Sequence, residues 1–450
     1  MKLHKVFNLK LSLLVLVTSS LLPAISYAEA LDFKMCVDQV LSQNPEMDVS
    51  SARIQQAKFA LGKAESSRLP QINFSITAAN SNNALSVFGM KLQQQSVVSA
   101  DFIPDSLNHP DAYTDFNTRL DMILPIWNGG KIGSYQDQAK AMIQAAKKGD
   151  VAVQQFLTYN VYQAYEAVHT ARAYINVAKQ AKKTADSFVK TTLNLVDEGV
   201  VVRSELLSAK VHQSMAETAL LKAKGQEQIA LDGLKILMNK TASDVIDVAG
   251  RVDLALPANS IEGLLKMAAT SNPQLAAKRE EAISYMYAEN VAKADRYPSF
   301  NVMMRKDWND EALSLSNGSY TVAGVVSWKV TDFGLTRNNI AMANASTLQQ
   351  KASVKSAENQ VRLDVLTYWR KMQIAQKQVQ ADNLAVQYAN EAQDLIVKRY
   401  KGGVATITEV LVSQTQLDKA KAELVSAKYD VNIYKAKLRL ATGTMDINQL

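Results

Sequence analysis

Apolar residues recur every three or four positions along two long stretches of the chain, a spacing that predicts helices packed along one face. The first seam comprises Leu206, Ala209, Gln213, Ala216, Leu220, Ala223, Glu227, Ala230, Leu234 and Leu237. The second comprises Val410, Ser413, Leu417, Ala420, Leu424, Ala427, Val431, Tyr434, Leu438 and Ala441. Many members of both seams are small, which lets helix backbones approach closely. A coiled-coil rod and an ordinary helical bundle would both have such seams.

The placement of proline favours the rod. No proline lies between Pro125 and Pro257, and none lies in the last third of the chain. Because proline costs about 3 kcal/mol inside a helix, these stretches are suited to long helices. Residues 131–198 would form a helix roughly 100 Å long. We expect two shorter helices, 203–240 and 261–296, to stack end to end against it.

Four segments between the predicted helices alternate apolar and polar residues with a period of two, which predicts β-strands. Their apolar positions are Ile72, Phe74, Ile76 and Ala78; Leu120, Met122 and Leu124; Phe300, Val302 and Met304; and Tyr320, Val322, Val326 and Trp328. Short amphipathic strands with aromatic residues near their ends are typical of outer-membrane β-barrels. The alternative is a pair of water-soluble hairpins that cap the helical rod.

Four strands per chain cannot close a membrane barrel, and an open edge would leave backbone groups unpaired in lipid. Two copies would supply a small barrel whose bore is filled by side chains. Three copies would supply twelve strands and leave room for a channel. If the strands enter a membrane, we therefore expect several copies to share one barrel.

Several landmarks occur twice in the same order, which indicates an internal duplication. Asn44-Pro45 recurs as Asn272-Pro273, and Gly199-Val200 recurs as Gly403-Val404. The first repeat is longer between its strands, where we expect an extended loop.

The duplication gives the expected domain organisation. The first repeat, 29–240, contains a helix, a β-hairpin at about 71–127 and a long helical hairpin at about 131–240. A connection at 241–260 leads to the second repeat, 261–446, which contains a helix, a β-hairpin at about 299–331 and a helical hairpin at about 335–442.

The N-terminal 28 residues have the pattern of an export signal. Three lysines precede the apolar run Leu11–Leu22, and Ser26-Tyr27-Ala28 places small residues where cleavage after Ala28 requires them. Cys36 lies beyond this site in a context that does not suit a lipid anchor, so we expect a free, packed thiol. No later segment has eighteen consecutive apolar residues, which excludes a helical membrane protein but not one built from strands.

Composition excludes several function classes. One cysteine and four histidines leave no material for a disulfide framework or a cysteine-built metal site. The net charge of +7 is partly carried by the export signal, and the remaining charges alternate in sign along helices, so we do not expect nucleic-acid binding. No catalytic constellation or phosphate-binding loop occurs at a meaningful spacing. We therefore expect neither an enzyme nor a cofactor.

The ordered set of duplicated landmarks resembles the TolC-like outer-membrane efflux and secretion channels over roughly Leu31 to Asp446. The set includes the Asn-Pro pairs, Leu69-Pro70 with Tyr297-Pro298, and the turn Trp127-Asn128-Gly129-Gly130. The resemblance implies a mainly α fold: a long antiparallel coiled-coil α-barrel plus four strands per chain in a shared twelve-stranded barrel.

The same resemblance implies a homotrimer in outer-membrane lipid, with its helical tunnel in the periplasm. It also implies two partners, a periplasmic adaptor (membrane fusion) protein and an inner-membrane transporter, in a tripartite efflux or type I secretion system. The cargo is not evident from the sequence. A periplasmic coiled-coil scaffold without a membrane pore is the alternative function.

Candidate functional residues lie at the two helix–helix turns. Gly199 and Gly403 are expected to end long helices with positive φ, as C-cap glycines do. The resemblance implies that these turns, with Val200 and Val404, contact the adaptor.

Acidic residues follow both turns. Glu205 and Glu409 would form rings at the tunnel entrance if threefold symmetry placed them inward, and such rings attract cations. Alternatively, they are helix-start acids favoured by the macrodipole. In similar channels a Tyr–Arg–acid latch closes the tunnel, and Tyr400 with Glu205 matches that pattern. Glu409 matches an entrance acid of the same channels. Ala405 stands where the latch arginine would be expected, and Val412 stands where a second entrance acid would be, which suggests a looser gate or other contacts such as Arg203.

Overall fold

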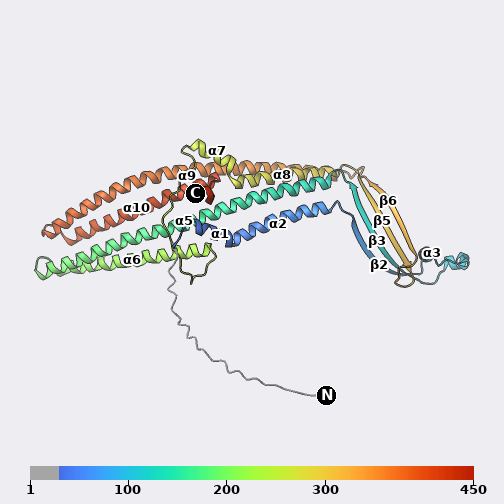
Figure 1. The fold of residues 1–450 in the computed structure, drawn as a ribbon, viewed down its shortest axis with the longest axis horizontal. Coiled ribbons are helices and arrows are strands. Elements are labelled where there is room, and N and C mark those ends of the chain that lie inside the picture. The colour runs from blue at the N-terminus through green and yellow to red at the C-terminus, as the bar shows by residue number, and fades with distance from the viewer. Residues whose placement is uncertain (1–29, 450) are drawn as a thin grey trace, which may run out of the picture.

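A computed structural model describes residues 30–449, so the predicted export signal and its cleavage site lie outside the described residues. The chain forms a long helical rod with a β-sheet at one end (Figure 1). The main helices are α1 (Phe33–Gln43), α2 (Pro45–Ser66), α5 (Lys131–Asp197), α6 (Arg203–Leu237), α7 (Ile261–Ser271), α8 (Pro273–Ala294), α9 (Leu335–Lys401) and α10 (Ile407–Thr442). No helix among the described residues combines the length and the apolar character needed to cross a membrane.

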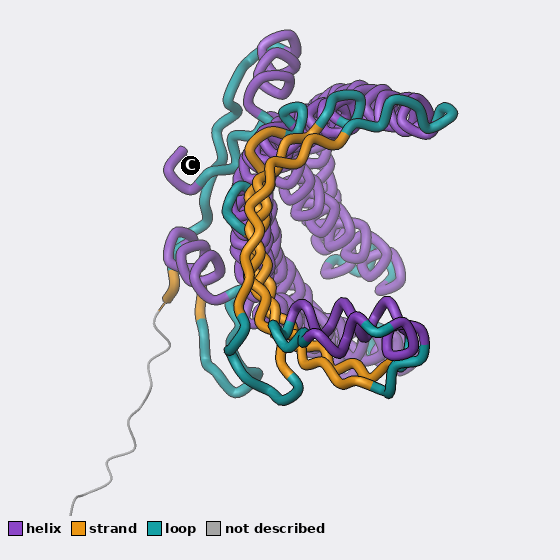
Figure 2. The backbone as a smooth tube through the Cα atoms, turned by 90° about the vertical axis from the view of Figure 1, so that its right-hand side faces the viewer, coloured by secondary structure: helices purple, strands orange, loops and turns teal. Residues whose placement is uncertain are grey.

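The long helices agree with the prediction from proline placement. Both α5 and α9 have 67 residues, which corresponds to roughly 100 Å each. Helix α5 packs against α6 towards one end and against α2 and α8 towards the other, and α9 packs against α10 and α8. All twenty predicted seam positions in α6 and α10 are buried or half-buried. Together the helices curve into an arc that is open on one side (Figure 2).

The predicted end-to-end stacking occurs, but its partners were wrong. Helix α6 is continued by α2 rather than by residues 261–296 (Figure 1). The two helices are joined by Asn44, whose Nδ2 donates a hydrogen bond to the Leu237 carbonyl oxygen at 2.9 Å. Helix α10 is continued by α8 in the same way, through Asn272 Nδ2 and the Ala441 carbonyl oxygen at 2.9 Å.

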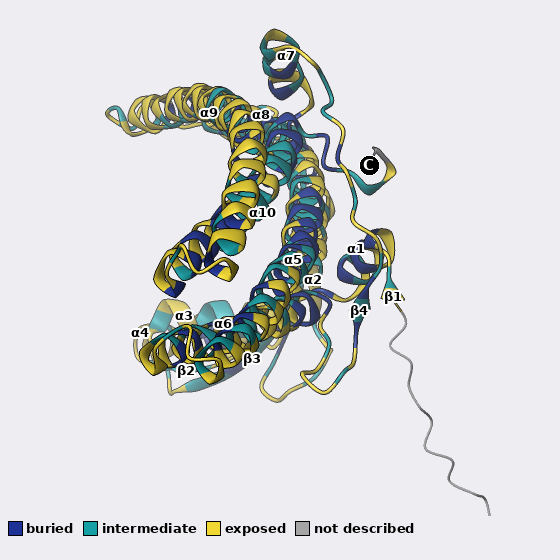
Figure 3. Ribbon diagram, turned by 90° about the vertical axis from the view of Figure 1, so that its left-hand side faces the viewer, coloured by how far each residue is buried: buried dark blue, intermediate teal, exposed yellow. Residues whose placement is uncertain are grey.

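Residues 261–296 do not form one helix. The chain breaks between α7 and α8 at Asn272, whose extended backbone caps α8 and precedes Pro273. Proline disfavours the helical conformation in the residue before it, which explains the break. Helix α7 lies on the outer side of the arc (Figure 3).

Four long strands form one antiparallel sheet at the end of the rod. They are β2 (Gln71–Ser81), β3 (Tyr113–Trp127), β5 (Ser299–Asp310) and β6 (Gly318–Ser327), in the order β2-β3-β5-β6. The two predicted hairpins are thus joined through β3 and β5. Strands β2 and β6 are the two edges. Two short strands, β1 (Ala30–Leu31) and β4 (Asp247–Val248), pair separately near the middle of the rod.

The connection between β2 and β3 is folded rather than a plain loop. It contains α3 (Ala84–Gln93), the 3-10 turn η1 (Ser99–Phe102) and α4 (Pro104–Asn108), and it projects beyond the strands (Figure 1). A second 3-10 turn, η2 (Ile447–Gln449), follows α10. Asn83 caps α3 by accepting a hydrogen bond from the Ser86 N–H at 3.1 Å. These helices are too short for a periodicity argument to detect.

The principal apolar core lies at the middle of the rod, where α1 and the 238–254 segment pack on α5 and α10. Phe33 of α1 contacts Tyr162 and Tyr165 of α5 edge-on, with ring centroids 5.8 Å apart in both pairs. Cys36 belongs to this core and is a free, fully buried cysteine, as predicted. Burial raises the pKa of its thiol to about 11, with a smaller contribution from Asp32.

Candidate functional site

Both long helices end in the same glycine-based turn, at the end of the rod opposite the sheet. After α5, Gly199 adopts φ +71°, and the Val200 N–H donates to the Leu195 carbonyl oxygen at 2.9 Å. After α9, Gly403 adopts φ +75°, and the Val404 N–H donates to the Arg399 carbonyl oxygen at 3.0 Å. These are Schellman C-caps, so the predicted backbone role of the two glycines is confirmed.

The residues after these glycines are apolar and exposed. The side chains of Val200 and Val404 are 55% and 68% exposed, and Val202 is similarly open. In a Schellman turn the equivalent apolar residue often packs back on its own helix. Here the valines remain on the surface, so the two tips present apolar side chains to the outside.

Directly behind the tips, Tyr400 of α9 connects the two helical hairpins. Its side chain is only 3% exposed and packs with Phe188, Ile407 and Val410. Its hydroxyl lies 3.0 Å from Thr192 Oγ1 of α5 and donates to Glu205 Oε2 of α6 at 3.5 Å. The structure therefore brings Tyr400 and Glu205 together. Burial is the largest cause of a raised pKa of the phenol; the hydrogen bond with Thr192 acts in the opposite direction, and the Glu205 carboxylate adds to the rise.

Glu409 has a local role at the start of α10. Its carboxylate accepts hydrogen bonds from the Thr406 N–H and hydroxyl, both at 3.2 Å, while the Glu409 N–H donates to Thr406 Oγ1 at 3.3 Å. This reciprocal pattern is a capping box, which agrees with the alternative interpretation of a helix-start acid. The side chain nevertheless remains exposed at the end of the rod.

The other residues around the expected latch differ in their exposure. Arg203 is exposed at the first position of α6, and Val412 is exposed on α10. Ala405 packs against the apolar cluster that contains Tyr400. At the position where the resemblance implied an arginine, this chain therefore has a packing contact.

A group of polar side chains between α9 and α10 was not predicted from the sequence. Gln393 Nε2 of α9 donates to Gln414 Oε1 of α10 at 3.1 Å, and Gln414 Nε2 donates to Asp418 Oδ1 at 2.9 Å. Burial is the main cause of a raised pKa at Asp418 and a lowered pKa at His212 of α6. The available sequence signal was a glutamine, Gln414, directly beside the seam position Ser413.

The sheet has one apolar and one polar face. Even-numbered residues of neighbouring strands lie on the apolar face, including the pairs Phe74 with Leu120 and Met122 with Met304. Odd-numbered residues lie on the polar face. There Arg119 pairs with Asp307 and Arg305 with Asp121, each at 2.7 Å between directly opposite residues of β3 and β5.

No group of three or more histidine, cysteine, aspartate or glutamate side chains within residues 30–449 is placed to hold a metal ion. The features described above are the two apolar tips, the buried hydroxyl contact of Tyr400 and the charged pairs between β3 and β5.

Comparison with known proteins agrees with this architecture. The sequence profile of the family described as outer membrane efflux protein matches residues 36–240 and 264–444. The outer membrane efflux protein BepC of Brucella suis biovar 1 (strain 1330) is 22% identical over 303 residues, which cover 65% of this chain and 64% of BepC.

Solved structures share the fold at low sequence identity. CusC superposes with a TM-score of 0.79 at 16% identity, covering 93% of each chain. VceC of Vibrio cholerae gives 0.76 at 17% identity, covering 91% of this chain and 96% of VceC. The open MtrE outer membrane channel of Neisseria gonorrhoeae gives 0.75 at 16% identity, covering 93% and 90%. Since the profile spans most of the described residues, the chain belongs to the outer membrane efflux protein family, as a TolC-like protein of the outer membrane.

Proposed function

We propose that this protein is the outer-membrane channel of a tripartite efflux or type I secretion system, in which three copies share a twelve-stranded barrel and a helical tunnel. The proposal rests on one observation. A sheet with one apolar and one polar face, and with two unpaired edge strands, continues directly into a helical arc that is open on one side (Figures 1 and 2).

The edges of the sheet require partners. Strands β2 and β6 have 11 and 10 residues and pair with only one neighbour each among the described strands. Long exposed edges in lipid would leave their N–H and C=O groups unsatisfied. Pairing β2 of one copy with β6 of the next removes every edge, and three copies close a barrel wide enough for passage.

Aromatic residues mark two levels on the apolar face. Trp308 and Tyr320 lie near one end of the sheet, and Phe300 and Trp328 lie near the other. Trp308 and Phe300 are separated along β5 by about 27 Å at 3.4 Å per residue. This is close to the apolar band of outer-membrane barrels, which is about 25 Å tall between two aromatic girdles.

The polar face then lines the bore. Its two opposite ion pairs, Arg119 with Asp307 and Arg305 with Asp121, fix the register of β3 against β5 and keep their charges away from lipid. The aqueous interior of such barrels is where charged side chains are tolerated.

Assembly with partners is proposed at the opposite end. The exposed Val200 and Val404, held on the Gly199 and Gly403 turns, form the surface for a periplasmic adaptor. The adaptor would link the tunnel to an inner-membrane transporter that supplies the energy. The helical body would lie in the periplasm, and the Tyr400–Glu205 contact and Glu409 would form its gate and entrance ring.

The equal elements of the two halves support an internal duplication with the domain limits proposed from the sequence. Helices α2 and α8 have 22 residues each, α5 and α9 have 67 each, and α6 and α10 have 35 and 36. Residues 29–240 and 261–446 are the proposed repeats, joined by the 241–260 connection.

Retention of a fluorescent efflux dye tests the proposal in cells that lack this chain. We expect dye retention to rise and to be restored by a plasmid copy. Unchanged retention with altered secreted proteins would assign the protein to secretion instead. The alternative, a periplasmic scaffold, would be released by osmotic shock, whereas a barrel requires detergent.

A further inference from the structure

A groove of about 1440 Å³ runs along the inner side of the helical arc. It is lined by α2, α5, α8, α9 and α10, and its wall includes nine alanines and four aromatic side chains. Phe156 of α5 contributes an exposed ring to it, 53% accessible. Phe156 precedes Tyr165 by about two and a half turns and so lies on the opposite face of α5. Because Tyr165 packs against α1 on the outside of the arc (Figure 3), Phe156 faces inward.

The charged residues of the groove are predominantly basic. Arg53, Lys63, Lys278 and Lys437 line it, against two acids, Glu281 and Asp364. Lys278 and Glu281 form an ion pair at 2.9 Å, so they neutralise each other. Within residues 30–449, Arg53 and Lys63 have no carboxylate within ion-pair distance. The groove therefore has a surplus of positive charge beside an apolar wall.

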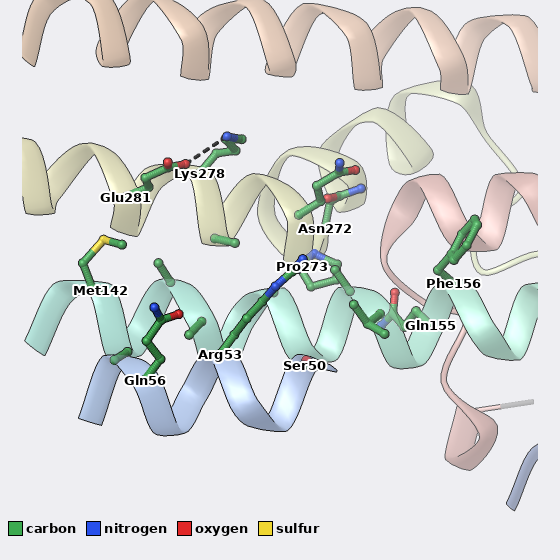
Figure 4. A pocket seen from close by; sticks show the side chains of 18 of the residues that line it. Ser50, Arg53, Gln56, Met142, Gln155, Phe156, Asn272, Pro273, Lys278 and Glu281 are labelled. Atoms are coloured by element: carbon green, nitrogen blue, oxygen red, sulfur yellow. Dashed lines mark hydrogen bonds and ion pairs between the residues drawn. The ribbon is translucent and has the colours of Figure 1, made fainter. Parts of the chain in front are cut away.

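Arg53 occupies the centre of this arrangement. Its side chain extends from α2 across α5 towards Asn272 and Pro273, at the start of α8 (Figure 4). The N-terminus of a helix of 22 residues carries the positive end of the macrodipole. A guanidinium directed at that end favours an anion between the two.

A second observation comes from Gln155, which lines the same groove and is only 7% exposed. Its Nε2 donates to the Gly443 carbonyl oxygen at 2.9 Å, which fixes the orientation of the amide. Its Oε1 has no hydrogen-bond partner among the described residues. A buried acceptor of this kind is costly unless a donor reaches it. Gln155 thus places an unsatisfied acceptor in the wall of the groove that Arg53 also lines.

We propose that the groove is a transient binding site for cargo, and that it binds aromatic amphiphilic anions that also carry an N–H or O–H donor. The anionic group lies between Arg53 and the start of α8, the donor bonds to Gln155 Oε1, and the rings pack on Phe156 and the alanine wall. The proposal rests on the proposed function only in stating that this side of the arc faces the passage.

Calorimetric titration of the full chain in lipid nanodiscs, with empty nanodiscs subtracted, tests the site. The probes are 1-anilinonaphthalene-8-sulfonate, which has rings, an N–H and a sulfonate, and its uncharged counterpart N-phenyl-1-naphthylamine. We expect the sulfonate to bind at least about tenfold more tightly, the value of one charge-assisted hydrogen bond. Arg53→Gln should remove most of that preference, and Phe156→Ala should weaken both probes.

Lys266→Gln is the matched control, because it removes one positive charge from α7 on the outer side of the arc. It should leave both affinities unchanged. Equal affinities for the two probes, or equal effects of Arg53→Gln and Lys266→Gln, would overturn the proposal. Binding that follows this pattern in a protein without channel activity would refute the proposed function and leave the site intact.

Discussion

Asn272 Nδ2 donates a hydrogen bond to the Ala441 carbonyl oxygen at 2.9 Å, while its Oδ1 accepts one from the Leu275 N–H at 3.0 Å. One side chain therefore caps the start of α8 and holds the end of α10 against it. Asn44 repeats the first contact with Leu237. Two short helices are in this way joined into one continuous support for a long helix.

Asn272→Asp should separate the two roles. Aspartate is as good an N-cap as asparagine, but it cannot donate to the Ala441 carbonyl. We expect a loss of about 1–3 kcal/mol in the free energy of unfolding, measured by denaturant unfolding in detergent with far-UV circular dichroism. Asn83→Asp is the control, since Asn83 caps α3 without such a joint. Equal stability of both variants would mean that the joint contributes nothing.

Gly443 makes the same joint sterically demanding. It adopts φ +72°, and a Cβ there would lie 2.3 Å from the Ser271 carbonyl oxygen. Gly443→Ala should therefore destabilise the protein by about 2 kcal/mol or more. Gly225→Ala, in open space on α6, should instead stabilise it by about 0.5–1 kcal/mol. A neutral Gly443→Ala would contradict the close packing of the α7–α8 junction on the end of α10.

Tyr400→Phe tests the contact between the hairpins. The ring would remain in its apolar cluster, whereas the bonds to Thr192 and Glu205 would be lost, a change of about 1 kcal/mol per copy. We expect a larger open fraction in planar bilayer recordings. Tyr388→Phe, an exposed tyrosine of the same helix, should have no effect. Identical gating in both variants would exclude Tyr400 as a latch.

Glu409→Gln removes a charge but preserves a capping box, since glutamine also serves at this position. If three copies of Glu409 surround the entrance, cation preference should fall in asymmetric salt solutions. Glu423→Gln, an exposed acid further along α10, provides the comparison. Unchanged selectivity would leave Glu409 with its capping role alone.

Asp418 should make stability depend on pH. Burial raises its pKa in the folded state, so its contribution to stability is complete below the unfolded pKa and is lost as pH rises through the folded pKa. Asp418→Asn removes this dependence. The stability of the variant relative to the original protein should increase between acidic and neutral pH in unfolding experiments. A difference that stays constant with pH would refute the assignment.

The elements that local sequence determines were predictable, and the long-range pairings were not. The absence of proline and the repeated seams predict α5, α6, α9 and α10 because helix propensity and periodicity act over neighbouring turns. The contact between Asn44 and Leu237 joins residues 193 positions apart. It depends on how the helices assemble, and no local pattern encodes that.

In the candidate site, too, the features set by local sequence were predictable and the long-range contacts were not. Gly199 and Gly403 were predictable because a positive φ favours glycine wherever a helix reverses. The Thr192 partner of Tyr400 was not, because it depends on the register between two helices 67 residues long. One threonine among many has no distinguishing sequence signal. The short helices α3 and α4 were missed for lack of enough turns.

Conductance of the purified protein in a planar lipid bilayer is the decisive test of the shared barrel. We expect discrete current steps of uniform size from a complex whose native mass corresponds to three chains. A protein that inserts, has another stoichiometry and gives no current steps would contradict the shared barrel. A protein that stays in solution without detergent would contradict the assignment of the apolar sheet face to lipid.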